Sequence, residues 1–89
     1  MKIGITHQRD PLMNYDITVT VDADTGETIA AVAVTINTVP SANDTPAPGT
    51  TGWEKEFNRA GQYPGDNTVE VIVTDQNGTV TRKKNQWTN

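Results

Sequence analysis

The sequence predicts an all-β protein, an antiparallel β-sandwich of about seven strands, from its composition and its patterning. The 89 residues include 9 Val, 6 Ile and 15 Thr but a single Leu, Leu12. Val, Ile and Thr suit a pleated sheet, whereas Leu is a preferred helix former. Apolar and polar residues alternate in several segments, and turn residues separate these segments every ~8–12 residues, a spacing typical of sandwiches. We therefore expect one domain over residues 1–89.

The first half of the chain contains three predicted strands. Residues 2–6 alternate and form a short strand, and residues 7–14, which include Asp10-Pro11, follow as a loop. Residues 15–22 alternate over their whole length, the pattern of a half-buried antiparallel strand. Residues 23–27 form a turn that contains Gly26, and residues 28–38 form a nearly continuous apolar strand.

The middle of the chain is predicted to be mostly irregular. Residues 40–52 hold three Pro and two Gly and are expected to be a flexible loop, unusually long for a compact domain. Residues 53–57 alternate again, with Trp53, Lys55 and Phe57 on one face. Residues 60–66 form a second turn region.

The last part of the chain is predicted to be a hairpin. Residues 67–75 form a strand with its valines inward, and Asn77-Gly78 has the composition of a type I′ turn, in which both central residues have positive φ. Residues 79–84 return as the final strand, and residues 85–89 form a C-terminal tail. One of the seven strands has no assigned segment. The predicted core consists of Ile17, Val19, Val21, Val32, Val34, Ile36, Trp53, Phe57, Val69, Val71 and Val73.

Charge and composition exclude several classes of protein. The net charge of −4 argues against a nucleic-acid binder, and no apolar run is long enough to span a membrane. The chain has no Cys, so neither a disulfide nor a Cys-ligated metal stabilises it. Arg82, Lys83 and Lys84 interrupt the acidic character and are interpreted as charges that protect an edge strand. A basic contact patch for an acidic partner is the alternative. Lys83→Ala should then change the stability by no more than about 0.5 kcal/mol.

Two stretches carry a resemblance to a known family. Residues 65–78, GDNTVEVIVTDQNG, have the spacing G-x-N-x-V-x-V-x-x-x-D-x-x-G, and residues 17–26 and 32–37 read ITVTVDADTG and VAVTIN. Over residues 15–85 the chain resembles bacterial Ig-like domains, with a looser similarity to PKD-type domains through Phe57, Gly61 and Tyr63. The resemblance implies an Ig-like sandwich that is repeated in secreted or surface proteins, with motif residues that serve the fold.

No catalytic site is expected, and the protein is not predicted to be an enzyme. Nucleophilic catalysis requires a base beside the nucleophile, but Ser41 and His7, the one Ser and the one His, lie in separate predicted loops. The carboxylates lie in turns or on polar strand faces, where solvation leaves them unsuited to acid–base catalysis.

One acidic turn is a candidate metal site. Asp22, Asp24 and Glu27 place oxygen atoms at a spacing suited to a hard cation such as Ca²⁺. The turn lacks the third aspartate and the acidic twelfth ligand of an EF-hand, so carboxylates that cap backbone amides are the preferred interpretation. A weak Ca²⁺ site is the alternative, and no other cofactor is expected.

The aromatic residues with a polar edge are the candidate ligand-binding residues. Trp53, Tyr63 and Trp87 could stack on sugars, but a core with one Leu and one Phe needs its large rings for packing. Trp53 is therefore expected in the core. Trp87, which follows the predicted last strand, is expected to be exposed or to anchor the tail.

The lack of a catalytic site, together with the resemblance to bacterial Ig-like domains, implies a non-catalytic structural, spacer or adhesion module of a larger bacterial secreted or cell-surface protein. Its expected partners are neighbouring domains or a surface glycan or protein, and the module is expected to be monomeric. A carbohydrate- or polymer-binding module is one alternative. A docking or decoration domain of a phage particle or a secretion apparatus is the other, because residues 1–4 do not begin a signal peptide.

Overall fold

The computed structural model describes residues 1–9, 15–59 and 66–88, which form seven strands and no helix. The strands are β1 (Lys2–Arg9), β2 (Tyr15–Asp22), β3 (Ile29–Ile36), β4 (Val39–Asp44), β5 (Gly52–Arg59), β6 (Asp66–Asp75) and β7 (Val80–Thr88). The prediction of an all-β sandwich with about seven strands is confirmed.

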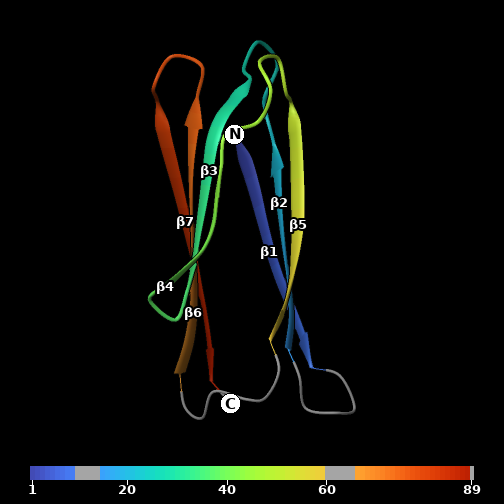
Figure 1. Ribbon diagram of the computed structural model, residues 1–89, viewed down its shortest axis with the longest axis vertical. Coiled ribbons are helices and arrows are strands. Elements are labelled where there is room, and N and C mark those ends of the chain that lie inside the picture. The colour runs from blue at the N-terminus through green and yellow to red at the C-terminus, as the bar shows by residue number, and fades with distance from the viewer. Residues whose placement is uncertain (10–14, 60–65, 89) are drawn as a thin grey trace.

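Two antiparallel sheets face each other along the long axis of the molecule (Figure 1). One sheet has the order β1-β2-β5 and the other the order β4-β3-β6-β7. The molecule measures 41 × 19 × 18 Å, so the strands run nearly its whole length. In the constant-type Ig arrangement the fourth strand pairs with the fifth. Here β4 pairs with β3 instead, so the sandwich consists of a three-stranded and a four-stranded sheet.

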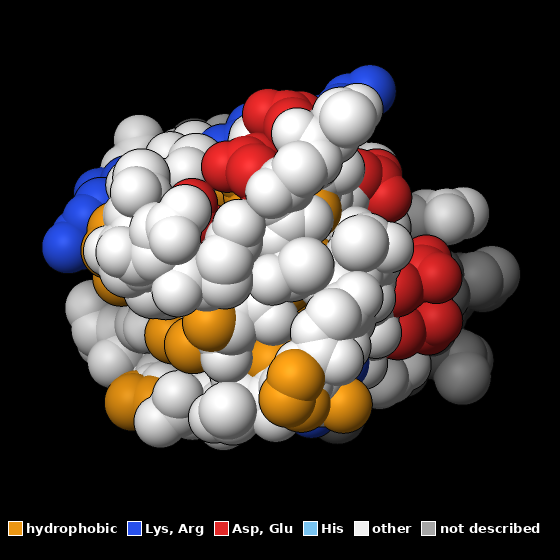
Figure 2. Space-filling model, turned by 90° about the horizontal axis from the view of Figure 1, so that it is seen from above, with side chains coloured by type: hydrophobic (Ala, Val, Ile, Leu, Met, Phe, Trp, Pro, Cys, Tyr) orange, Lys and Arg blue, Asp and Glu red, His pale blue; other side chains and the backbone are white. Residues whose placement is uncertain are grey.

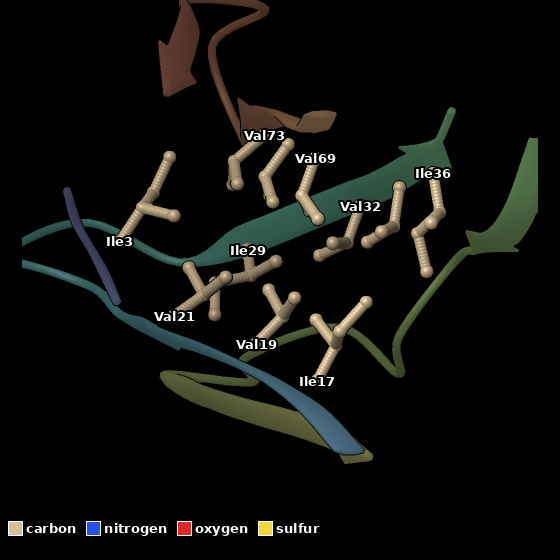
Figure 3. Packing of buried hydrophobic residues seen from close by; sticks show 11 residues of the cluster. Ile3, Ile17, Val19, Val21, Ile29, Val32, Ile36, Val69 and Val73 are labelled. Carbon is tan, nitrogen blue, oxygen red and sulfur yellow. The ribbon is translucent and has the colours of Figure 1, made fainter. Parts of the chain in front are cut away.

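The core forms because the alternating residues of β2, β3 and β6 point into the space between the sheets. Figure 3 shows the side chains of Ile17, Val19 and Val21 pointing toward those of Val32 and Val69 in the opposite sheet. Nine of the predicted core residues are buried. They are Ile17, Val19, Val21, Val32, Val34, Ile36, Val69, Val71 and Val73.

The remaining core predictions need correction. Trp53 and Phe57 only pack against the core and are half-buried, because β5 lies at the edge of its sheet. Ile3 and Ile29 are buried and complete the core, although the sequence analysis did not include them. Both lie on the inner faces of their strands, where Ile3 pairs with Val21 and Ile29 pairs with Asp75.

The predicted loop 40–52 is wrong over its first part. Residues 39–44 form β4, the missing seventh strand, and residues 45–51 connect it to the other sheet. The register between β3 and β4 shifts between Val34 and Thr35, directly beside the pair of Thr35 and Pro40. A bulge on an edge strand is where a sheet tolerates proline, which has no N–H for the ladder.

Positive φ angles occur at a different hairpin from the predicted one. Asn37 and Thr38, with φ of 49° and 66°, are the two residues between the paired Ile36 and Val39. Positive φ at both central residues is the requirement of a type I′ turn.

The turn at Asn77-Gly78 is therefore not type I′. Only Gly78 has positive φ there, and its N–H donates to the carbonyl of Asp75 over 3.1 Å. The Asp75 carboxylate accepts from the amides of Asn77 and Thr79, both at 2.9 Å, which creates a three-residue hairpin loop. This explains the D-x-x-G pattern at residues 75–78.

Both terminal strands are longer than predicted. His7 to Arg9 continue β1 because each residue pairs with β2, up to Arg9 opposite Tyr15. The tail prediction for residues 85–89 is wrong as far as Thr88, because β7 pairs with β6 along its whole length. The predicted turn at residues 60–66 lies outside the described residues except for Asp66, the first residue of β6.

Candidate functional site

Two of the three predicted metal ligands meet at the amino group of Met1. This ammonium lies 2.5 Å from Oδ2 of Asp24 and 3.1 Å from Oε1 of Glu27. The Asp24 amide also donates to Oε1 of Glu27 over 3.2 Å, as expected for carboxylates that cap a turn. The hydrogen bond to the ammonium lowers the pKa of Asp24, and the two carboxylates raise the pKa of the Met1 amine.

The third predicted ligand, Asp22, does not take part in this cluster of ion pairs. It ends β2 opposite Lys2 and Gly52. Within the described ranges, no group of three or more His, Asp or Glu side chains is gathered as a metal ion requires. The geometry thus favours the capping interpretation of this turn, and a Ca²⁺ site stays an untested prediction.

Trp53 closes one open side of the sandwich. Its Nε1 donates to Oδ2 of Asp44 over 3.1 Å, and Nζ of Lys55 lies 3.8 Å from the same oxygen. Trp53 and Lys55 belong to β5 and Asp44 to β4, so these contacts join the edge strands of opposite sheets. We call Asp44, Trp53 and Lys55 the β4–β5 seam.

Trp87 closes the opposite side and lies within β7, so its predicted position beyond the last strand is wrong. Its ring stacks on that of His7, with ring centroids 4.2 Å apart and an angle of 10° between the planes. Lys83 Nζ donates to the carbonyl of Ile3 over 2.9 Å. We call Ile3, His7, Lys83 and Trp87 the β1–β7 seam. Both tryptophans are half-buried and pack against the core.

The structure brings together one predicted aromatic and one predicted carboxylate. Trp53 and Asp22 line a shallow hollow of about 390 Å³ with Thr20, Gly52 and Glu54. The hollow exists because Gly52 has no side chain beside Asp22, its partner in the sheet. Tyr63, the third predicted aromatic, lies outside the described residues.

A larger groove lies on the outer face of the four-stranded sheet and was not predicted from the sequence. Its volume is about 470 Å³, within the range of about 300–1,000 Å³ common for ligand sites. It crosses β3, β6 and β7 near the β3–β4 turn. The lining residues are Thr35, Asn37, Thr38, Asp66, Thr68, Glu70 and Lys84.

One wall of the groove is the β3–β4 turn, which Asn37 holds against β6. The Asn37 side chain accepts from the amide of Thr68 at 2.8 Å and donates to Oδ1 of Asn67 at 3.0 Å. The Asn37 amide donates to the carbonyl of Thr68 at 2.9 Å. Thr38 is a β-branched residue at positive φ, an outlier that costs free energy.

The groove carries both hydrogen-bond donors and acceptors. Glu70 and Lys84 lie opposite each other on β6 and β7, yet the interactions of the described residues include no ion pair between them. The sequence signal for this site is weak, because its residues come from three strands and are polar residues of an ordinary outer face. Only Asn37-Thr38, two polar residues between apolar runs, could have indicated a turn there.

The outer faces of the two sheets also differ in charge. Among the side chains that the structure describes, Asp16, Asp22, Glu54 and Glu56 share the outer face of the three-stranded sheet with one cation, Lys2. Figure 2 shows Asp and Glu side chains on the side of β5 and a group of Lys and Arg side chains on the opposite side, where β7 lies.

Comparison with known proteins gives no family assignment. No protein-family model matches the chain, and a search of the curated proteins finds no match. Over the part of the chain that is described, no helix has the length and apolar character to cross a membrane.

Proposed function

We propose that the chain is a non-catalytic Ig-like spacer or adhesion module of a larger bacterial secreted or cell-surface protein. The observation that carries this proposal is the placement of the first and last strands. β1 starts beside the end of β2, and β7 ends beside the start of β6, at opposite ends of a molecule 41 Å long (Figure 1). A chain that passes through this fold therefore enters at one end and leaves at the other.

This arrangement suits a module under tension. A force between the two ends acts along β1 and β7, whereas the hydrogen bonds of antiparallel ladders lie perpendicular to the strands. The force therefore shears many bonds at once. The ladder between β1 and β2 runs from Lys2–Asp22 to Arg9–Tyr15, and that between β6 and β7 from Asp66–Thr88 to Thr74–Val80.

The seams support the same role. A sandwich with a thin core exposes its interior along its open sides, where sliding of the sheets would let water enter. The β4–β5 seam joins the two sheets by a hydrogen bond and an ion pair, and the β1–β7 seam joins them by a hydrogen bond and a ring contact.

Force spectroscopy on single molecules tests the proposal, with the chain placed between two reference domains. An unfolded chain of 89 residues spans about 290–320 Å, so unfolding from 41 Å should add about 250–280 Å in one cooperative step.

The matched control pulls the same protein through Asn58→Cys and Thr88→Cys, since the chain has no Cys of its own. Both positions lie near the lower end of Figure 1, so this geometry peels β5 and β7 from their neighbours one pair at a time. We expect a clearly higher unfolding force for the end-to-end geometry. An end-to-end force equal to or below the peeling force would contradict the proposal.

A further inference from the structure

We propose that the groove on the outer face of the four-stranded sheet, at the β3–β4 turn, binds an uncharged oligosaccharide. This goes beyond the spacer role and does not depend on it. The groove is the larger of the two hollows described above, at about 470 Å³, and residues from β3, β6, β7 and the turn converge on it.

The polar groups of the groove are available to a ligand. No hydrogen bond or ion pair of the described residues engages the side chains of Thr35, Thr38, Thr68, Glu70 or Lys84. Thr hydroxyls both donate and accept, the Lys84 ammonium donates, and the Glu70 carboxylate accepts. A ligand rich in hydroxyls satisfies both kinds of group, because each hydroxyl can donate and accept.

The charges of the groove are mixed and favour a neutral ligand over an anion. Asp66 and Glu70 repel an anion such as phosphate, and the Lys84 ammonium offsets part of their attraction for a cation such as an amino sugar. A neutral ligand meets no repulsion from either sign of charge. The Thr methyl groups add small apolar surfaces, which suit the C–H faces of a sugar ring.

The turn that walls the groove is held in a conformation that costs stability. Asn tolerates positive φ, but the branched Cβ of Thr38 at a φ of 66° crowds the backbone. Such strain persists where the surroundings enforce it and is concentrated at functional sites. Here the three hydrogen bonds from Asn37 to Asn67 and Thr68 enforce it, and Thr38 lines the groove.

The tryptophans are less suited to the same ligand. The indole N–H of Trp53 already donates to Asp44, and the ring of Trp87 is stacked on His7. The Trp53 indole therefore offers no free N–H to a sugar, and the Trp87 ring already has a stacking partner, whereas the Thr, Glu and Lys side chains of the groove have no such partners among the described residues.

NMR titration of the full ¹⁵N-labelled chain tests the proposal. The neutral probes are cellohexaose, maltohexaose and N-acetylated chitohexaose, each up to about 10 mM, because a shallow site binds with a Kd near ~1 mM. Fully deacetylated chitohexaose and an oligogalacturonate serve as charged probes. We expect at least one neutral probe to shift the amides of Thr35, Thr38, Thr68 and Glu70.

Variants within the groove give the second test. Thr68→Val removes one hydroxyl at nearly constant shape and should weaken binding about three- to tenfold, the value of one hydrogen bond. Glu70→Gln keeps an acceptor and should change the affinity for a neutral sugar by less than about threefold, but would abolish attraction of a cation. Thr38→Gly should raise the thermal midpoint and weaken binding. Thr74→Val, on the same face of β6 outside the groove, should change nothing.

Three results would overturn the proposal. The first is that none of the neutral probes shifts the groove amides, and the second is that shifts centre on the indole signals of Trp53 and Trp87. The third is that only a charged probe binds. None of these results bears on the force measurement, so failure here is distinct from failure of the spacer role.

Discussion

The two open sides of the sandwich are both closed by contacts between the sheets, but the hydrogen bonds on the two sides have different acceptors. Each seam combines one tryptophan with one lysine that points inward from an edge strand. In the β4–β5 seam, Trp53 and Lys55 converge on one carboxylate oxygen of Asp44. In the β1–β7 seam, Lys83 reaches a backbone carbonyl and Trp87 meets an aromatic ring.

This difference determines which substitutions can remove the contacts of each seam. The acceptor of the β4–β5 seam is a side chain, so one substitution at Asp44 removes both of its polar contacts. The acceptor of the β1–β7 seam is the carbonyl of Ile3, which no substitution removes. The contacts of that seam can be removed only by substitution of Lys83 or of the stacked His7 and Trp87. Inward-pointing lysines on edge strands also discourage pairing with other chains, so both seams protect the sheet edges.

The largest expected effect is loss of the fold when a charged side chain is introduced into the core between the two seams. Val71→Asp buries an unpaired carboxylate at a position with 0% exposure and should prevent cooperative folding. Ile72→Asp, the neighbouring residue on the outer face opposite Arg82, should cost less than about 1 kcal/mol. Thermal unfolding followed by circular dichroism distinguishes them, and similar losses for both variants would contradict the assignment of the faces.

The next effect comes from removal of the shared acceptor in the β4–β5 seam. Asp44→Ala should cost about 1.5–3 kcal/mol, the value of hydrogen bonds to a charged group in a partly buried site. Asp16→Ala removes a carboxylate that accepts from Asn58 over 2.6 Å at an exposed position and should cost no more than about 0.5 kcal/mol. Urea titration gives both values, and equal costs would show that the seam adds nothing.

Loss of the ammonium from the β1–β7 seam should have a smaller effect. Lys83→Met keeps the length of the side chain but removes the donor to Ile3, at an expected cost of about 0.5–1.5 kcal/mol. This exceeds the limit of about 0.5 kcal/mol predicted from the sequence for Lys83→Ala, because the hydrogen bond to Ile3 is a tertiary contact. Lys84→Met, on the outer face, is the matched control and should stay within about 0.5 kcal/mol. If urea denaturation gives the two methionine variants the same stability, the interstrand hydrogen bond is without effect.

The smallest effect is a pH dependence of the stability, which arises from the ion pair of Met1 and Asp24 beside the start of β1. The raised pKa of the Met1 amine stabilises the fold fully below its ordinary value of 8.0, and this contribution is lost as pH rises through the folded pKa. The lowered pKa of Asp24 stabilises above its ordinary 3.8, and this contribution is lost as pH falls through the folded pKa. The ion pair should therefore contribute fully between these values.

Acetylation of the amine isolates this contribution. The thermal midpoints of the free and acetylated chains should differ near neutral pH, and the difference should shrink in strong acid and in strong base. A difference that does not change with pH would contradict the ion pair.

Local pattern was sufficient wherever one face of a strand is buried. Residues 15–22 and 67–75 alternate because each strand has the core on one side and water on the other. Residues 28–38 are predicted as a strand from a different signal, a nearly continuous apolar run, and β3 covers Ile29–Ile36 of this range. These three strands supply ten of the eleven buried core residues, so the sandwich could be predicted from sequence alone.

Local pattern failed where a neighbour decides the conformation. Val39–Asp44 has the composition of a loop, and it is a strand only because β3 offers a free edge and a bulge accommodates Pro40. Asn77-Gly78 has the better type I′ composition, yet the Asp75 carboxylate stabilises a longer loop there, because it accepts hydrogen bonds from the amides of Asn77 and Thr79. The less suitable pair Asn37-Thr38 takes positive φ instead, because Asn37 bonds to β6.

The sequence by itself determined the fold class and the core strands, because alternation records which side of a strand meets water. Only the tertiary structure decided the seams and the groove. Lys83 and Ile3 are 80 residues apart, and the groove draws its side chains from three strands and a turn. Such contacts depend on which strands become edges and on the register between sheets, and neither leaves a mark in any single segment of the chain.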